Sequence, residues 1–403
     1  MLIYTNIKMN ILFVFFSLPH LSQSAMYSDM VNEFQKNGHN VYPMAPIISD
    51  SSKSYISIEN RIEVLRVKTL DVFSKNVFEK GFANLLLSYQ YKNAFTLFWK
   101  NRAIELVIVT TPSVMFADFI SDIKKSKGSK VYLMQKDIFP QNAVDLGLMK
   151  KKSLIFKFFK KKECKLLAAA DIVGCTSPGN IKYFLNNYSF LDKKKVQLLY
   201  NNSKLFNRSD EFKFNNKDFS NMFTVVFGGN MGKPQQLENV LNLAKRTLNF
   251  KDVIFIVVGK GTENDKLKEV ASQMGVNNLK FIDSLSRENY FKLISSCNLG
   301  LISLHQDFTV PNTPMKLNDY LNAGIPVLAS IDRSNDLGEL LVNNKMGKYA
   351  YSDSPDILFE QFLKFYEDKD LCNELGKNGY DFCLNNLSVK NAYQDVLKQL
   401  DAL

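Results

Sequence analysis

The sequence contains few of the side chains from which metal and redox centres are built. Five cysteines and three histidines are scattered over 403 residues, and no two cysteines are spaced as CxxC. These counts argue against a zinc site, a redox dithiol or a multi-histidine metal centre. The odd number and wide spacing of the cysteines favour a reducing compartment over a disulfide framework. We therefore predict no bound metal.

A long hydrophobic run is also missing. No segment approaches the roughly 20 apolar residues that a membrane-spanning helix needs. The stretch NILFVFF, residues 10–16, has the character of a signal-peptide core, but it is short and no small-residue cleavage site follows it. We predict a cytoplasmic protein that is peripheral on the inner face of the cytoplasmic membrane. Met9 is an alternative first residue, because MNILFVFF makes a natural first strand and the preceding residues do not.

Positive charge, in contrast, is in excess. The chain has 51 Lys and Arg against 40 Asp and Glu, a formal net charge of +11. This excess predicts attraction to anions without choosing among nucleic acid, anionic lipid and phosphorylated substrates. No nucleic-acid recognition motif accompanies the lysines, so we expect no nucleic-acid partner.

Short runs of β-branched and aromatic residues alternate with longer amphipathic segments along the whole chain. Continuous apolar runs of this kind are typical of strands buried on both faces, as in parallel sheets covered by helices. The predicted strands are 10–16, 39–46, 62–68, 105–112, 130–135, 171–177 and 196–200, then 223–230, 252–261, 279–285, 299–304, 324–330 and 347–352.

The two series of strands predict two doubly wound α/β domains, with ligand sites at the carboxyl ends of their strands. A polar segment, 201–221, separates them and is predicted to be a linker. This places an N-terminal domain over 1–200 and a C-terminal domain over 222–385. The last segment, 386–403, has a helical pattern with no strand after it, and we expect it to pack back on the N-terminal domain.

A glycine-bearing loop joins a predicted strand to a helix in FTVVFGGNMGKPQQLE. Gly228, Gly229 and Gly232 allow the backbone to approach a ligand closely, and Lys233 adds a cation. The N-terminus of the following helix offers N–H groups to a phosphate. The spacing matches neither GxGxxG nor Walker A, and a plain tight turn explains the glycines equally well.

Two further segments carry candidate ligand-binding residues. Gly259 and Gly261 repeat the strand–glycine–helix arrangement, for which ordinary turn chemistry is again sufficient. In PMKLNDYLNAGIPVLAS, Lys316 and Asp319 lie three residues apart on one helical face, where they can serve a phosphate and a sugar hydroxyl. A surface ion pair is the alternative for these two residues.

Taken with NGHNV and QKDIFPQNAVDLGLMKKKS, these motifs give a sequence that resembles the retaining family-4 glycosyltransferases of GT-B fold. QKDIFPQNAVDLGLMKKKS and GNMGKPQQLE are similar to the branch that builds O-antigen and capsule repeat units, including N-acetylfucosaminyltransferase-like members. The resemblance implies two Rossmann-like domains facing a cleft. It also implies metal-independent transfer of a sugar to a polyprenyl-diphosphate-linked saccharide acceptor. The donor would be a nucleotide sugar, such as a UDP-N-acetyl amino sugar, bound as a substrate, and the resemblance implies no cofactor.

The resemblance also implies roles for individual residues. Asp137 matches a recurrent aspartate on the acceptor side, and Lys316 would contact the donor phosphates, which makes these two the catalytic candidates. Asp319 falls at the second position of the family's Glu-x7-Glu motif, which holds the ribose. The full donor-binding set is Gly229, Asn230, Gly232, Lys233, Gly259, Gly261, Ile282, Asn312, Thr313, Lys316 and Asp319.

The sequence departs from the family pattern at four positions. The first glutamate of Glu-x7-Glu falls on Pro311, and the second is the shorter Asp319. The arginine and lysine that many relatives place on the phosphate loop align with Asn230 and Gln235. Two alternatives therefore stay open: a UDP-sugar 2-epimerase on the same fold, and a non-catalytic partner in a polysaccharide-assembly complex.

The most basic stretch is KKKSLIFKFFKKKECK, residues 150–165. Its apolar residues Leu154, Ile155, Phe158 and Phe159, with Leu166, fall roughly on a helical stripe. The stripe is either packed core beneath solvated lysines, or one face of a helix lying on an anionic membrane that carries the acceptor. The predicted membrane-facing residues are Lys150, Lys151, Lys152, Phe156, Lys160, Lys161 and Lys162.

Overall fold

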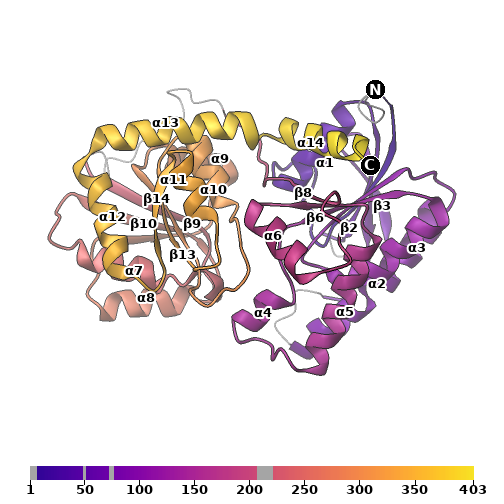
Figure 1. The fold of residues 1–403 in the computed structure, drawn as a ribbon, viewed down its shortest axis with the longest axis horizontal. Helices are drawn as coiled ribbons and strands as arrows, with labels where there is room; N and C mark the ends of the chain where they lie inside the picture. The colour runs from indigo at the N-terminus through magenta and orange to yellow at the C-terminus, as the bar shows by residue number, and fades with distance from the viewer. Residues whose placement is uncertain (1–6, 49–50, 72–76, 207–220) are drawn as a thin grey trace. The chain divides into compact units, whose positions relative to one another are not determined.

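In the computed structural model, the chain divides into two compact units. The described residues are 7–48, 51–71, 77–206 and 221–403 (Figure 1). We call Met1–Lys204 together with Val389–Leu403 the N-terminal unit, and Leu205–Ser388 the C-terminal unit. Residues 207–220, most of the predicted linker, lie outside the described residues.

The N-terminal unit is built on an eight-stranded sheet with the order β3-β4-β2-β1-β5-β6-β7-β8. All its neighbouring strands run parallel except β3 and β4. The strands are β1 Asn10–Val14, β2 Asn40–Pro46, β3 Tyr55–Glu59, β4 Ile62–Val67, β5 Leu106–Thr110, β6 Lys130–Gln135, β7 Ile172–Cys175 and β8 Val196–Leu198. The helices are α1 Met26–Lys36, α2 Val77–Trp99, α3 Ala117–Lys127, α4 Gln141–Asp145, α5 Leu154–Ala169, α6 Pro178–Asn187 and α14 Val389–Asp401.

One strand of this sheet, β3, was not predicted. It pairs antiparallel with β4 through a tight hairpin at Asn60 and Arg61, whose φ angles are 49° and 64°. Two consecutive residues with positive φ match the hairpin turn that the twist of adjacent strands favours. The turn contains no glycine, so the usual sequence signal for such a hairpin is missing.

The final helix, α14, packs within the N-terminal unit. Val396, Leu397 and Leu400 are at most 1% exposed and join the core formed by α1 and the first strands. The Tyr393 hydroxyl lies 3.1 Å from Nε2 of His39, the residue that precedes β2. The last turns of the chain therefore complete the core of this unit.

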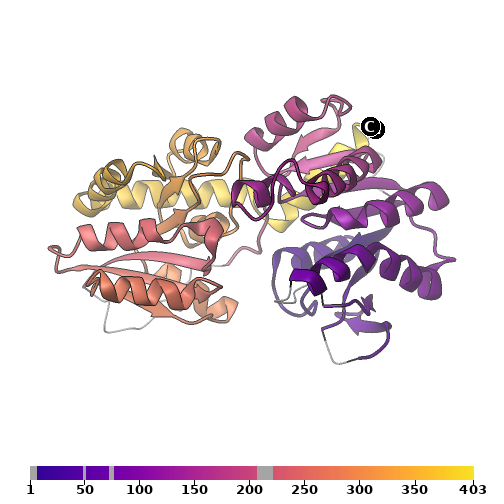
Figure 2. The ribbon, with the colours of Figure 1, turned by 90° about the horizontal axis from the view of Figure 1, so that it is seen from below.

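The C-terminal unit has a six-stranded parallel sheet with the order β11-β10-β9-β12-β13-β14. Its strands are β9 Phe223–Asn230, β10 Val253–Lys260, β11 Leu279–Ile282, β12 Leu299–Ser303, β13 Val327–Ile331 and β14 Gly347–Tyr351. Helices lie on both faces of the sheet, as Figure 2 shows. They are α7 Glu238–Arg246, α8 Asn264–Gln273, α9 Arg287–Ser295, α10 Lys316–Ala323, α11 Leu337–Asn343, α12 Pro355–Glu367 and α13 Lys369–Asn386. The two-domain parallel α/β fold is confirmed, and each predicted run contains a strand.

Helix α5 is oriented differently from the prediction. Leu154, Ile155 and Phe158 are 82%, 61% and 38% exposed, so the interpretation of the whole stripe as core is wrong. Of the stripe, Leu166 is buried, and Phe156 and Leu167 are buried beside it. Phe156 is only 8% exposed, so its assignment as membrane-facing is also wrong. The helix turns about 100° per residue, so residues 156, 163 and 167 share the face that packs inward.

Two of the predicted membrane-facing lysines have partners inside the unit. Lys160 pairs with Glu163 at 3.0 Å and lies over the Tyr188 ring. Lys162 pairs with Asp118 of α3. These contacts turn the middle of α5 toward its own domain. The exposed lysines of the set are Lys150, Lys151, Lys152 and Lys161.

Candidate functional site

A cavity of about 540 Å³ opens at the carboxyl ends of β9 and β10 in the C-terminal unit. Carboxyl ends of parallel strands are where α/β sheets bind ligands. The loop after β11 and the start of α10 complete the wall. The lining residues are Gly228, Gly229, Asn230, Gln235, Val258, Gly259, Lys260, Ser284, Leu285, Tyr290, Pro314, Met315, Lys316 and Asp319.

The cavity brings together only part of the predicted donor-binding set. Gly229, Asn230, Gly259, Lys316 and Asp319 line it, although they come from three separate segments of the sequence. The other predicted residues are not among its lining residues: Gly232, Lys233, Gly261, Ile282, Asn312 and Thr313.

Gly259 explains why the two glycine loops can lie so close together. Its φ is +144°, and a Cβ at this position would stand 1.9 Å from the carbonyl oxygen of Gly229. The glycine is therefore required by the contact between the ends of β9 and β10. Ordinary turn chemistry, the alternative considered above, does not account for that close contact.

Lys316, the first residue of α10, is a buried lysine. It is 9% exposed, and its Nζ lies 3.7 Å from the centre of the Phe227 ring. Burial lowers the pKa of Lys316 to about 7, while the nearby Asp319 opposes this shift. The amine therefore changes its charge near neutral pH, and an anionic ligand would favour its protonated form.

Asp319 lies one turn further along α10 and is paired with a different cation. Its Oδ1 accepts a hydrogen bond of 2.8 Å from Nη2 of Arg287. Burial raises the pKa of Asp319, and Arg287 and then Lys316 counteract that rise. The alternative of a surface ion pair between Lys316 and Asp319 is wrong, because both residues are only 9% exposed.

Two tyrosines, Tyr290 and Tyr320, lie beside Gly228 of the first glycine loop. The Tyr320 hydroxyl accepts a 2.9 Å hydrogen bond from the Gly228 N–H and lies 3.2 Å from the carbonyl oxygens of Val226 and Leu301. Burial raises the pKa of Tyr290, which lines the cavity, well above its usual value. Sequence reasoning missed both tyrosines and Arg287. The only sequence signal for Tyr320 was its position next to Asp319.

Asp137, the second predicted catalytic residue, follows β6 in the N-terminal unit. The backbone N–H groups of Lys136 and Asp137 both donate to Thr111 Oγ1, at 2.8 and 3.0 Å. Burial raises the pKa of Asp137, and Lys136 opposes this rise. Burial also lowers the pKa of Lys136 to about 7, and its buried Nζ has no hydrogen-bond partner among the described residues. The residues after β6 therefore include a buried amine and a buried carboxyl group, each of which opposes the effect of burial on the other's pKa.

Within residues 7–48, 51–71, 77–206 and 221–403, neither a metal-binding cluster nor a membrane-spanning helix is present. There, no group of three or more His, Cys, Asp or Glu side chains is placed to hold a metal ion. None of its helices combines the length and apolar character needed to cross a bilayer.

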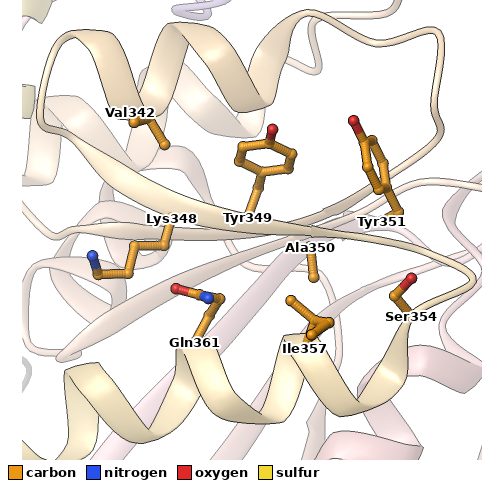
Figure 3. A pocket seen from close by; sticks show the side chains of 8 residues that line it. All are labelled: Val342, Lys348, Tyr349, Ala350, Tyr351, Ser354, Ile357 and Gln361. Carbon is orange, nitrogen blue, oxygen red and sulfur yellow. The ribbon is translucent and has the colours of Figure 1, made fainter.

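A second cavity, of about 360 Å³, lies at the edge strand β14 (Figure 3). Tyr349 and Tyr351 lie on one side of the strand, and Ile357 and Gln361 of α12 lie on the other. The remaining lining residues are Val342, Lys348, Ala350 and Ser354. No predicted site residue lines this cavity.

Comparisons with known proteins bear on both the sequence and the fold. Residues 208–382 match the family model described as "Glycosyl transferases group 1". The uncharacterized glycosyltransferase MJ1069 of Methanocaldococcus jannaschii is 22% identical, and the match covers 98% of each chain. The probable glycosyltransferase WbjE of Pseudomonas aeruginosa is also 22% identical, over 59% of this chain and 60% of that protein. A chitobiosyldiphosphodolichol beta-mannosyltransferase of Candida albicans is 25% identical over 66% of this chain and 62% of that protein.

Solved structures share the fold. Sucrose-phosphate synthase from Thermosynechococcus elongatus has a TM-score of 0.78 at 12% identity, covering 98% of this chain and 100% of that one. Anabaena HepE in complex with UDP has a TM-score of 0.67 at 14% identity, with the same coverage of both chains.

Proposed function

Because the chain is a glycosyltransferase whose residues 208–382 match group 1, we propose that it transfers a sugar from a UDP-linked donor to a lipid-linked saccharide. The donor class we propose is a UDP-N-acetyl amino sugar, and the pathway is bacterial O-antigen or capsule synthesis. The observation that supports this most is the cavity after β9 and β10. It gathers a buried lysine, a buried carboxylate and two close-packed glycine loops.

The chemistry follows from these groups. Breaking the bond between sugar and diphosphate places negative charge on the leaving phosphate. Lys316 would stabilise that charge from the N-terminus of α10, where the helix dipole acts in the same direction. Asp319 would accept hydrogen bonds from the ribose hydroxyls of the nucleotide. No step of this scheme requires a metal ion.

We assign the acceptor to the N-terminal unit. Asp137 would accept a proton from the attacking hydroxyl, a role that suits a carboxylate whose pKa burial raises. The printed name of the Candida albicans relative indicates a diphosphate-linked lipid saccharide as that protein's acceptor. A polyprenyl-diphosphate-linked saccharide is the corresponding proposal here.

A nucleotide-binding screen tests the donor class. Isothermal titration with UDP, GDP, ADP and CMP should give measurable binding to UDP, weakened about tenfold or more in Lys316→Ala. Equal binding of all four nucleotides would remove the UDP assignment. Absent binding of all four would favour a non-catalytic assembly partner. Incubating a UDP-sugar with the enzyme and no acceptor checks for the 2-epimer, which the transferase should not form.

A surface at the start of α5 supports a peripheral contact with anionic lipid. Leu148, Leu154 and Ile155 are 71%, 82% and 61% exposed, and all lie beside the exposed lysines of Lys150–Lys152. Exposed large apolar residues close to a cluster of lysines are typical of surfaces that insert into the headgroup region. Each lysine near an anionic leaflet contributes about 1 kcal/mol. An acceptor carried on a polyprenyl chain lies in such a leaflet.

Vesicle co-sedimentation tests this contact. Replacing Lys150–Lys152 with glutamine, or Leu154 and Ile155 with serine, should release the protein from vesicles containing phosphatidylglycerol. A matched control replaces three exposed lysines of the C-terminal unit, Lys245, Lys251 and Lys369, with glutamine. Equal loss of binding in the control would mean that only net charge matters, and unchanged binding in both α5 variants would refute the contact.

A further inference from the structure

Arg287 occupies a place that its own helix does not favour. It is the first residue of α9, where the helix dipole repels a cation. The helix is already capped by Ser286, whose hydroxyl accepts a hydrogen bond from the Asn289 N–H. Local helix stability therefore does not explain an arginine here, and its side-chain contacts have to be considered.

Those contacts connect α9 to α10. The guanidinium donates through Nη2 to Asp319 Oδ1 at 2.8 Å. It also lies over the Phe206 ring, 5.7 Å from the ring centre, and Phe206 stacks on Phe291 at 4.3 Å. An arginine held between an aromatic face and a carboxylate has little rotational freedom, and it restricts the carboxylate in the same way.

The ion pair between Arg287 and Asp319 takes the place of one between Lys316 and Asp319. Asp319 is three residues from Lys316 on the same face of α10, so an ion pair between them would be the expected local arrangement. Arg287 occupies Oδ1 instead, and Lys316 lies over the Phe227 ring. Among the described residues, none donates a hydrogen bond to Asp319 Oδ2. One carboxylate oxygen is therefore left for a ligand that lies in the cavity.

We propose that Arg287 is a positioning residue that holds Asp319 so that Oδ2 accepts a hydrogen bond from a ribose hydroxyl of the donor nucleotide. The inference rests on the proposed function, since it concerns the same donor site. Arg287 also prevents Asp319 from neutralising Lys316, whose amine stays available to the phosphates. The aspartate is shorter than the glutamate typical of the family, and a fixed orientation compensates for that shorter reach.

Discrimination between ribose and deoxyribose tests the positioning role. Isothermal titration of the full chain would compare UDP with 2′-deoxy-UDP and 3′-deoxy-UDP. We expect the wild type to bind UDP about tenfold or more tightly than at least one deoxy analogue, because a hydrogen bond to a charged group is lost. Asp319→Asn and Arg287→Gln should both reduce that preference to about twofold or less. Arg287→Lys, which keeps a donor, should restore part of it.

Controls separate positioning from folding. Glu288, the next residue, pairs with Lys292 on the exposed side of α9, so Glu288→Gln should keep the wild-type preference. Thermal unfolding identifies any variant that loses its fold. If Arg287→Gln is unfolded, Arg287→Lys is compared with the wild type instead. In that case a full wild-type preference in Arg287→Lys refutes the proposal, and a reduced one supports it.

The outcomes also distinguish this inference from the proposed function. If the wild type binds no UDP, the proposed function itself fails. If UDP binds and Asp319→Asn loses the ribose preference while Arg287→Gln keeps it, only the positioning role is refuted. If the wild type binds UDP but shows no ribose preference, Asp319 does not contact the ribose, and the inference is again overturned.

Discussion

The buried amine of Lys316 predicts a particular pH dependence of donor binding. Its pKa is lowered to about 7 by burial, so above neutral pH the free enzyme holds this lysine mostly uncharged. The diphosphate of a UDP-sugar does not titrate in this range and favours the protonated amine. Binding above pH 7 therefore requires the uptake of a proton, and affinity should fall as the pH rises.

The magnitude follows from this linkage. Each pH unit well above the pKa of the free lysine should weaken binding about tenfold. Because half of the lysine is already uncharged at pH 7, affinity should fall about fiftyfold between pH 7 and pH 9. Below pH 7 the lysine is already protonated and the affinity should level off. Isothermal titration of one UDP-sugar from pH 6 to pH 9 measures the slope. Repeating it in buffers of different ionisation enthalpy measures the proton uptake, which should approach one at pH 9.

Variants show whether Lys316 is the titrating group. Lys316→Arg keeps its charge throughout this range, so its profile should be nearly flat, and Lys316→Ala should be flat and weak. Burial lowers the pKa of Lys136 to about 7 as well, so Lys136→Gln is the matched control and should keep the wild-type slope. A flat wild-type profile, or a slope that survives in Lys316→Arg, would refute the reasoning.

Two further predictions concern the fold that supports the site. Gly259→Ala should destabilise the protein by about 3 kcal/mol or more in thermal unfolding, because its Cβ would clash with the Gly229 carbonyl. In the control Gly275→Ala, the new Cβ meets no atom of the described residues within 4 Å, so the cost should be only about 1 kcal/mol. Glu59 and Arg66 form a buried pair, 2.7 Å apart, so Glu59→Gln should cost about 3–5 kcal/mol. Burial raises the pKa of Glu59, but the hydrogen bonds from Arg66 and the Leu21 N–H lower it more, so the pKa of the folded state lies below the usual carboxyl value. The ionised Glu59 therefore stabilises the fold at any pH above the usual carboxyl pKa. That contribution should be lost as the pH falls through the lowered value, and an unchanged acid-unfolding midpoint in Glu59→Gln would contradict this.

The parallel sheets could be predicted because their strands are buried on both faces. Continuous runs such as Leu106–Thr110 and Leu299–Ser303 have no polar face, and only a sheet covered by helices accommodates them. The hairpin of β3 was missed because Asn60 and Arg61 take positive φ without a glycine. Strands that form continuous apolar runs could therefore be predicted, and β3 could not.

The candidate site was only partly predictable for a different reason. Lys316 and Asp319 are close in sequence, and their spacing alone placed them on one helical face. Arg287 lies about thirty residues earlier, and its contact with Asp319 depends on how α9 packs beside α10. Similarly, Leu154 and Ile155 were assigned to a stripe, but tertiary packing of Phe156 determined which face of α5 turns inward. Helical periodicity defines a face, but it does not determine which face is buried.

The most direct measurement is a transfer assay with the full chain. The protein would be incubated with a panel of UDP-sugars and a polyprenyl-diphosphate-linked saccharide in vesicles containing phosphatidylglycerol. We expect one donor to be consumed, with one UDP released for each sugar added, and Lys316→Ala to slow transfer about tenfold or more. No UDP release and no extended saccharide with any donor, from protein that also fails to bind UDP, would contradict transfer from a UDP-sugar.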